Sequence, residues 1–251
     1  MQTGRVPKNV HAEKRPATLA VIRRQLGALG DPGAATALLR FFKTGPGEYG
    51  AGDCFRGIHV PALRALAKEH AGLPLPQVLR LLASRWHEDR LVALLILVRQ
   101  FECGDASARA RVYAAYCAQT GRINNWDLVD LSAPNIVGAW LLSRDEPKPL
   151  MRLAQSDVLW ERRIAIVASH AFIRHRRFDV TLSLAARLLE DRHDLIHKAT
   201  GWMLREVGKR DAAVLTGFLD RHAGRMPRTM LRYAIEKFPE RIRKQYLAGT
   251  I

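Results

Sequence analysis

The sequence lacks the features of a membrane-spanning or exported protein. Its longest apolar run, from Leu91 to Val98, is far shorter than the roughly eighteen residues that a membrane-spanning helix needs. Residues 1–16 are polar and basic and contain no apolar core of the kind that a signal peptide carries. We therefore expect no association with a membrane, and a basic, loosely held N-terminal arm over residues 1–17.

Cysteine is scarce, and no familiar metal-binding or nucleophile motif is present. Cys54, Cys103 and Cys117 are an odd number at unrelated spacings, which gives neither a disulfide framework nor a Cys-x-x-Cys metal site. The nine histidines are scattered, without His-Glu-x-x-His spacing, and Gly-x-Ser-x-Gly is absent. These absences predict a protein of the reducing cytoplasm that works without a metal or other cofactor.

Acidic residues are few relative to basic ones. The chain has 40 Lys and Arg against 24 Asp and Glu, a formal net charge of +16 and a pI near 10.6. The basic residues are spread over the whole chain instead of forming a tail. So large an imbalance favours a polyanionic partner such as nucleic acid. A solvated basic surface without a partner is the competing explanation.

Apolar residues recur with a helical period over nearly the whole chain after the arm. The expected helical runs are Leu19–Leu29, Ala34–Phe42, Pro61–His70, Pro76–Ser84, Asp89–Phe101, Ser107–Gln119, Ala133–Leu142, Pro149–Ala154, Val158–Arg174, Val180–Glu190, Leu195–Val207, Ala212–Arg221 and Arg228–Phe238. Prolines lie near the starts of several runs and glycines near the ends, as helices prefer. No stretch alternates like a strand, so the prediction is an all-α protein.

The helices also repeat along the sequence. A basic residue opens an apolar helix at Arg90, at Arg163 and at Lys198; the last two lie 35 residues apart and the first two 73, close to two such periods. The intervening register falls near Trp126. A period of 35 to 40 residues with two helices per unit is typical of a HEAT-like α-solenoid. We therefore expect residues 18–251 to form one such domain, with these four positions together on its concave face.

One long segment, residues 43–61, does not fit the helical pattern. It holds five glycines and two prolines, but it has neither the Gly-Lys-Ser/Thr ending nor the preceding strand of a phosphate-binding loop. A loop of this length is usually functional or disordered. It either places Tyr49 or Phe55 against a ligand or simply links two helices.

An acidic and aromatic cluster, Asn124-Asn125-Trp126-Asp127-Leu128-Val129-Asp130, interrupts this basic chain. Residues four apart share a helix face, so Trp126 and Asp130 should lie together while Asp127 points elsewhere. The repeat register adds Trp202 to the same surface. Indole faces attract cations by about 0.5–2 kcal/mol, so this group predicts a site for something cationic. The alternatives are that the tryptophans are core residues and that Asp127 is a helix cap.

Several motifs resemble the AlkD-like DNA alkylation repair family over residues 18 to 240. They are Phe41 to Asp53, Phe55 to Pro61, Asn125-Trp-Asp-Leu-Val-Asp130 with Pro134, and Lys198-Ala-Thr-Gly-Trp-Met-Leu-Arg-Glu206. The resemblance implies HEAT-like repeats and removal of positively charged N-alkylated purines, 3-methyladenine and 7-methylguanine, from double-stranded DNA. It also implies that the base need not be flipped into a pocket.

The resemblance assigns roles to individual residues. It makes Asp130 the catalytic carboxylate, with Trp126 and Trp202 the indoles that grip the lesion nucleotide. It places Arg163 near the DNA backbone and, less directly, Tyr49 against the DNA. With the repeat register, Arg90 and Lys198 are expected to bind phosphates too. The enzyme would act as a monomer, and the competing hypotheses are a non-catalytic solenoid that binds distorted or branched DNA and a protein–protein scaffold.

Overall fold

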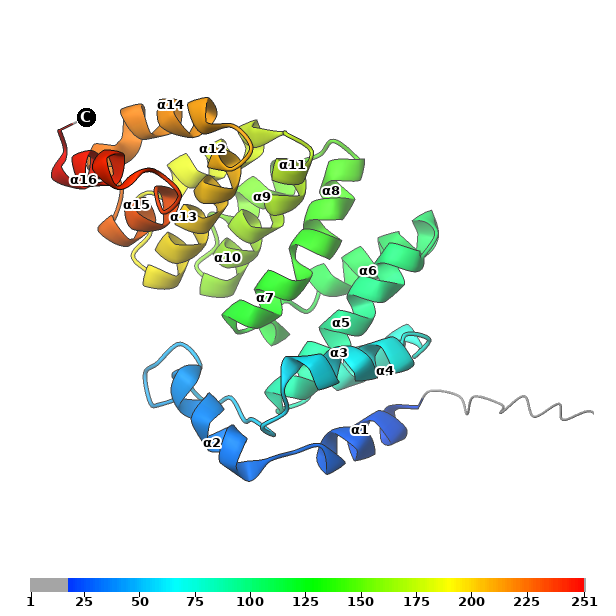
Figure 1. Ribbon diagram of the computed structural model, residues 1–251. Coiled ribbons are helices and arrows are strands. Elements are labelled where there is room, and N and C mark those ends of the chain that lie inside the picture. Colours follow the sequence, from blue (N-terminus) through cyan, green and yellow to red (C-terminus); the bar gives the residue numbers. More distant parts are fainter. Residues whose placement is uncertain (1–17, 251) are drawn as a thin grey trace, which may run out of the picture.

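The computed structural model describes residues 18–250, and most of them are helical (Figure 1). The helices are α1 (Leu19–Ala28), α2 (Pro32–Phe41), α3 (Val60–Glu69), α4 (Leu75–Leu82), α5 (His87–Cys103), α6 (Ala106–Cys117), η1 (Thr120–Arg122), α7 (Trp126–Ser132), the π-helix η2 (Pro134–Gly138), α8 (Ala139–Ser143), α9 (Lys148–Leu153), α10 (Leu159–Ala168), α11 (His170–Arg174), α12 (Phe178–Arg187), α13 (Asp194–Gly208), α14 (Ala212–His222), η3 (Ala223–Arg225), α15 (Arg228–Ala234) and α16 (Glu240–Ala248). Within this part of the chain the only β-type pairing is an isolated bridge between Cys54 and Trp86. The all-α prediction is confirmed, and the predicted basic arm lies outside the described residues.

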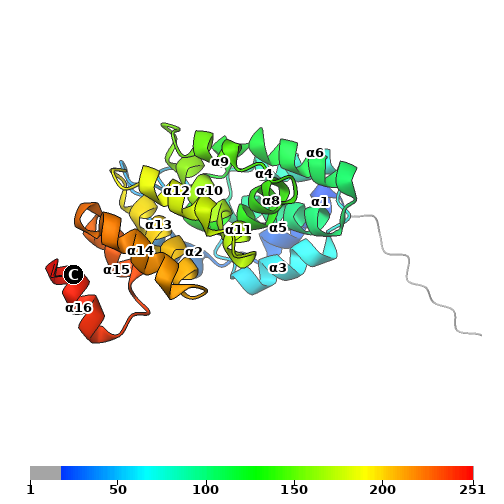
Figure 2. The ribbon, with the colours of Figure 1, turned by 90° about the horizontal axis from the view of Figure 1, so that it is seen from above.

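The helices pack in series along the chain. In one row, which we call the inner helices, α5 contacts α7, α7 contacts α10, α10 contacts α13, and α13 contacts α15. A second row, made of α6, α8, α11, α12 and α14, covers it (Figure 1). Seen from above, α1 and α16 lie at opposite ends of the molecule (Figure 2). This serial packing is the arrangement expected of a stack of helix pairs.

The centre of the core is α5, the helix that holds the longest apolar run. Residues Leu91 to Val98 are all buried, because α3, α4, α6 and α7 pack around the helix. A helix that is apolar all round is stable only when it is enclosed in this way. Within residues 18–250, no helix is both long and apolar enough to cross a membrane.

Some predicted runs are divided in the structure. The run Val158–Arg174 breaks between α10 and α11 at Ser169, whose hydroxyl donates to the Ile166 carbonyl oxygen and so competes with the backbone hydrogen bonds of the helix. The run Ala133–Leu142 begins as a π-helix at Pro134, where proline removes one donor from the α-helical ladder. Helix α16 lies beyond the last predicted run and packs on α15.

Three inner helices carry a charged residue at the same place. Asp130, Arg163 and Lys198 are each the fifth residue of α7, α10 and α13. The sequence register assigned this place to Trp126, which is instead the first residue of α7, one turn earlier. This corrected register puts Asp130 beside Arg163 on adjacent helices.

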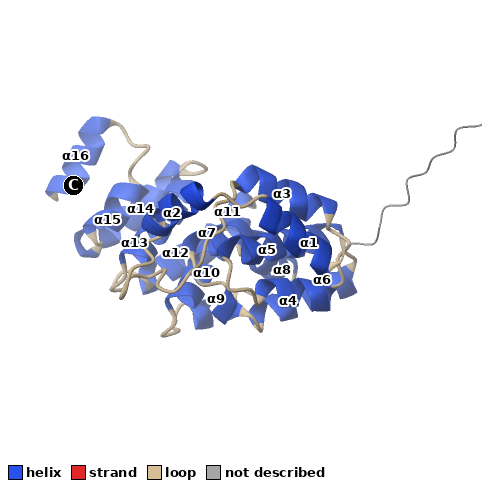
Figure 3. Ribbon diagram, turned by 90° about the horizontal axis from the view of Figure 1, so that it is seen from below, coloured by secondary structure: helices blue, strands red, loops and turns tan. Residues whose placement is uncertain are grey.

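Helix α2 and the glycine-rich segment after it (residues 43–59) lie opposite α7, α10 and α13 (Figures 1 and 3). The segment from Lys43 to His59 is a loop, as predicted. The loop makes a tight turn at Gly57, where φ is 82°. A Cβ atom there would lie 2.0 Å from the Asp31 carbonyl oxygen, so only glycine fits. The Glu88 carboxylate at the start of α5 accepts hydrogen bonds from the backbone N–H groups of Arg56, Gly57 and Ile58.

Candidate active site

A cavity of about 510 Å³ lies between the glycine-rich segment and the inner helices. It gathers six of the seven residues predicted from the sequence: Trp126, Asp130, Arg163, Lys198, Trp202 and Tyr49. The other lining residues are Phe41, Lys43, Leu195, Ala199, Arg205 and Tyr233. Elements that are far apart in the sequence therefore contribute to one site, with two indoles and a carboxylate among basic side chains.

The two aspartates of α7 point to different sides of the helix. Trp126 and Asp130 line the cavity together, as their spacing predicts. Asp127 turns to the other side, where its Oδ2 lies 2.8 Å from His87 Nε2. The cap of this helix is Asn125, whose Oδ1 accepts from the Trp126 N–H at 2.8 Å. Asp127 is therefore not the N-cap residue of α7.

A bidentate ion pair holds Asp130. Arg163 Nε lies 3.0 Å from Asp130 Oδ1 and Arg163 Nη2 lies 2.8 Å from Oδ2, while Nη1 donates to the Leu195 carbonyl at 2.7 Å. Burial raises the pKa of Asp130, the charge of Arg163 opposes that rise, and nearby Asp127 adds to it. The guanidinium thus both orients the carboxylate and favours its ionised form.

This pairing changes the role expected for Arg163. Its side chain is only 6% exposed, and all three of its nitrogens donate to groups of the protein. The family resemblance predicted a contact near the DNA backbone, which needs a guanidinium free to face phosphates. The structure instead places Arg163 beside the carboxylate as its support.

Trp202 is fixed through its indole N–H. The Nε1 atom lies 3.3 Å from Glu206 Oε1, and Lys209 Nζ and Arg210 Nη1 lie 2.6 Å and 3.4 Å from the same carboxylate. Burial would raise the pKa of Glu206, but the bonds and charges of these cations outweigh it and hold the pKa below its usual value. An ionised Glu206 is a strong acceptor for the indole N–H.

Two further polar side chains lie on the cavity wall. Lys198 is half-exposed, and its Nζ lies 2.7 Å from Asp194 Oδ2; this bond raises the pKa of Lys198. Tyr49 reaches the cavity from the glycine-rich segment and packs edge-on against Trp160, with 6.1 Å between ring centroids. Burial raises the pKa of Tyr49, so it carries a neutral hydroxyl at neutral pH.

Arg90 is not part of this site, contrary to the prediction. It is 4% exposed. Its Nη2 lies 2.6 Å from Asp53 Oδ1, and its Nη1 donates to the carbonyl oxygens of Ser84 and Arg85. Arg90 therefore ties the glycine-rich segment to α5 through Asp53 and does not line the cavity.

A column of aromatic rings supports Trp126, and sequence reasoning missed it. Phe42 stacks on Trp126 with 5.2 Å between centroids, and Phe55 stacks on Phe42 at 4.9 Å. Phe41 meets Trp126 edge-on at 5.8 Å and is 62% exposed, so it borders the cavity with its ring open to solvent. The signal was the pair Phe41-Phe42 directly before the glycine-rich segment.

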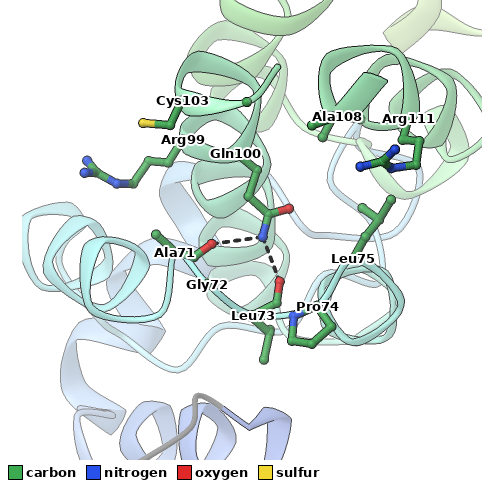
Figure 4. A pocket seen from close by; sticks show the side chains of 12 residues that line it. Ala71, Gly72, Leu73, Pro74, Leu75, Arg99, Gln100, Cys103, Ala108 and Arg111 are labelled. Atoms are coloured by element: carbon green, nitrogen blue, oxygen red, sulfur yellow. Dashed lines mark hydrogen bonds between the residues drawn. The ribbon is translucent and has the colours of Figure 1, made fainter. Parts of the chain in front are cut away.

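A second cavity, of about 450 Å³, lies where the 71–75 turn meets the end of α5 and has a different lining (Figure 4). There Gln100 Nε2 donates to the carbonyl oxygens of Ala71 and Leu73 at 2.9 Å and 2.7 Å, so its amide holds the turn. No carboxylate lines that cavity. Within residues 18–250 no cluster of three or more His, Cys, Asp or Glu suits a metal ion.

Comparisons with known proteins identify the fold and the family of this chain. It is similar in fold to a solved structure described as a predicted DNA alkylation repair enzyme from Enterococcus faecalis, with a TM-score of 0.64 and 16% identity over 84% of this chain and 97% of that chain. No curated protein sequence matches the chain significantly. A family model described as DNA alkylation repair enzyme matches residues 22–238, which include every residue of the cavity. The chain therefore belongs to the DNA alkylation repair enzyme family.

Proposed function

We propose that the protein is a DNA glycosylase that hydrolyses the N-glycosidic bond of positively charged N-alkylated purines, 3-methyladenine and 7-methylguanine, in double-stranded DNA. One observation carries the proposal. The Asp130 carboxylate is held by two hydrogen bonds from Arg163 and lies in one cavity with Trp126 and Trp202. A fixed anion flanked by aromatic faces suits a cationic substrate.

The residue types match the needs of this reaction. An N-alkylated purine already carries a positive charge and is a good leaving group, so no general acid has to protonate it. As the C–N bond breaks, positive charge develops on the sugar. The Asp130 carboxylate stabilises that charge and orients the attacking water, and the indoles exclude solvent and favour the cation.

Arg163 makes the carboxylate suitable for both tasks. An ionised carboxylate has about four lone-pair directions, and the guanidinium occupies one on each oxygen. The remaining directions are left for the sugar and the water. Because the guanidinium sets the plane of the carboxylate, little reorganisation is needed at the moment of reaction.

DNA binding would rest mainly on the basic side chains of the cavity and its surroundings. Lys43, Lys198 and Arg205 line the same cavity as Asp130. Contacts of this kind to phosphates give affinity without reading sequence. The catalytic groups Trp126, Asp130 and Trp202 all come from α7 and α13 on one wall of the cavity, so they can approach the sugar from one side while the base stays stacked. We therefore propose excision without base flipping, by a monomer.

Base release from methylated duplex DNA tests the proposal. The protein is incubated with the DNA in the presence of a chelator, and free 3-methyladenine and 7-methylguanine are measured by mass spectrometry. We expect release by the parent protein and a loss of about a hundredfold or more in Asp130→Asn. The matched control, Asp157→Asn, alters an exposed aspartate outside the cavity and should release bases at the parental rate.

The assay also separates the main alternative. Duplex affinity should be similar in the parent and in Asp130→Asn, because the carboxylate does not contact phosphates. A parent protein that binds the duplex tightly but releases neither base would contradict the proposal and favour a non-catalytic DNA-binding protein.

A further inference from the structure

His87 lies between two carboxylates in the interior of the protein. Its Nε2 is 2.8 Å from Asp127 Oδ2 and its Nδ1 is 3.2 Å from Asp53 Oδ2. The ring is 2% exposed. Asp127 follows Trp126 in the first turn of α7, and Asp53 lies within the glycine-rich segment. One side chain thus bridges the two parts of the chain that form opposite walls of the cavity.

The contacts with two carboxylates favour the imidazolium form of His87. A neutral imidazole has one donor and one acceptor nitrogen, so it would turn a lone pair toward one of the carboxylates. Burial opposes the charged form, but the hydrogen bonds to Asp127 and Asp53 outweigh it and raise the pKa of His87 to about 9. The residue is also the first of α5, where the helix dipole disfavours a cation. The two carboxylates are therefore what keeps this charge in place.

The ring is connected to Trp126 in two ways. Phe55 stacks on His87 with 4.6 Å between centroids, and the stack continues through Phe42 to Trp126. Asn125, the cap of α7, donates to Asp53 Oδ2 at 3.2 Å and accepts from the Trp126 N–H. Any movement of His87 therefore reaches Trp126 both through the stack and through the helix start.

We propose that the His87 imidazolium is a positioning residue: by joining Asp53 to Asp127 it holds Trp126 and the start of α7 in the orientation needed for base excision, and its deprotonation releases them. This inference rests on the proposed glycosylase function. His87 is not among the residues that line the cavity, and it contacts none of the groups proposed to act on the substrate. It acts through Trp126 and the helix that also carries Asp130.

The other charged groups around His87 are already paired. On α5 itself, Glu88 accepts from the backbone of the glycine-rich segment, Asp89 pairs with Arg56, and Arg90 pairs with Asp53. On α7, Asp130 pairs with Arg163. None of these groups offers a replacement donor to both Asp53 and Asp127, so the bridge depends on the proton of His87.

The first measurement does not depend on base excision. Protein with ¹⁵N-labelled histidine and tryptophan is titrated from pH 6 to 10 by NMR, with Trp126 assigned through Trp126→Phe. We expect His87 to be doubly protonated at pH 7.5 and the Trp126 indole signal to shift with the same midpoint, near pH 9. In His87→Gln the indole shift with that midpoint should be absent. A neutral His87 at pH 7.5, or an indole signal that ignores the titration, would overturn the proposal.

The second measurement is single-turnover excision of 7-methylguanine against pH, with duplex affinity measured in parallel. We expect the parental excision rate to fall as His87 deprotonates while affinity stays nearly constant. His87→Gln should lower the rate about tenfold to a hundredfold, as expected for a misplaced group, and should lose this alkaline decline. His222→Gln, on α14, is the matched control and should keep both the parental rate and the parental profile.

The outcomes separate the two proposals. If the parent releases no base at any pH, the glycosylase function fails, whereas the NMR titration still decides whether His87 holds Trp126. If the parent is active but its rate is flat through pH 9.5, or His87→Gln excises at the parental rate, the positioning role is wrong. Asp53→Asn provides a check should His87→Gln fold poorly: with one carboxylate removed, the alkaline decline should move to lower pH.

Discussion

The ion pair between Asp130 and Arg163 is best tested by a double-mutant cycle. The variants are Asp130→Asn, Arg163→Met and the two combined. Methionine keeps much of the length of arginine but cannot donate a hydrogen bond, and asparagine keeps the shape of aspartate without its charge. If the pair acts as one unit, either single change should abolish the function that both residues share.

The expected magnitudes follow from the burial of the pair. Removing one partner of a buried ion pair costs about 3–5 kcal/mol of stability. The Asp130 side chain is 18% exposed, so water partly replaces the lost partner and we expect the lower end, about 3 kcal/mol. For a protein of this size that lowers the Tm by about 6–12 °C. The double variant should lose about 3 kcal/mol instead of the sum, about 6 kcal/mol, which gives an interaction of about 3 kcal/mol.

Unfolding in urea and single-turnover excision of 7-methylguanine measure the two effects. Arg163→Met should excise about as slowly as Asp130→Asn, and the double variant no more slowly than either, because residues that act as a unit are not additive. In Arg163→Met the pKa of Asp130 should rise, since burial remains while the opposing charge is gone. Part of its lost activity should therefore return at higher pH.

A phosphate-binding role for Arg163 makes different predictions. In that case Arg163→Met would weaken duplex binding, lower the salt dependence of log K by about 0.9 and leave the single-turnover rate of the saturated complex intact. Additive stability losses in the cycle, together with that pattern of binding, would refute the assignment of Arg163 as the support of Asp130.

Three further outcomes are expected. In the folded protein the pKa of His87 is raised from 6.5 to about 9, so the imidazolium stabilises the fold fully below pH 6.5 and loses this effect as the pH rises through 9. The free energy of unfolding in urea should therefore fall between pH 6 and pH 10 by about 3 kcal/mol more in the parent than in His87→Gln. Glu206→Ala frees the indole N–H of Trp202 and should slow excision about tenfold, whereas the parental rate in that variant would show that Trp202 needs no such anchor. Lys198→Gln should weaken duplex binding and lower its salt dependence by about 0.9, with the excision rate of the saturated complex unchanged.

Helical periodicity was sufficient to predict that Trp126 and Asp130 share a face, because four residues complete about one helical turn. The repeat also linked them to Trp202, although it misplaced the register by one turn. Periodicity alone, however, says which face a residue occupies and not what lies opposite. The family resemblance placed Arg163 near the DNA backbone, whereas its pairing with Asp130, 33 residues away on another helix, could not be predicted from periodicity.

The contacts of the glycine-rich segment could not be predicted from the sequence for the same reason. Asp53 lies 37 residues from Arg90 and 34 from His87, and only the folded path of the glycine-rich segment brings them together. The sequence showed the glycines and the charges but not the path of the chain between them. Arg90 therefore looked like a surface cation, although it is a buried tie between the loop and α5.

Holding an ionised Asp130 in the cavity lowers the stability of the fold, as the raised pKa of this residue shows. A carboxylate whose folded pKa is raised stabilises the native state below its unfolded pKa and loses that contribution as the pH rises, so ionised Asp130 is a net burden at neutral pH. A pair of apolar side chains of similar size often replaces a buried ion pair without loss, or with a gain of about 1–4 kcal/mol. We therefore expect Asp130→Leu combined with Arg163→Met to unfold at the parental urea concentration or above while excising no base. If the variant Asp130→Leu/Arg163→Met were several kcal/mol less stable than the parent, the pair would serve the fold, and its placement in the cavity would say little about catalysis.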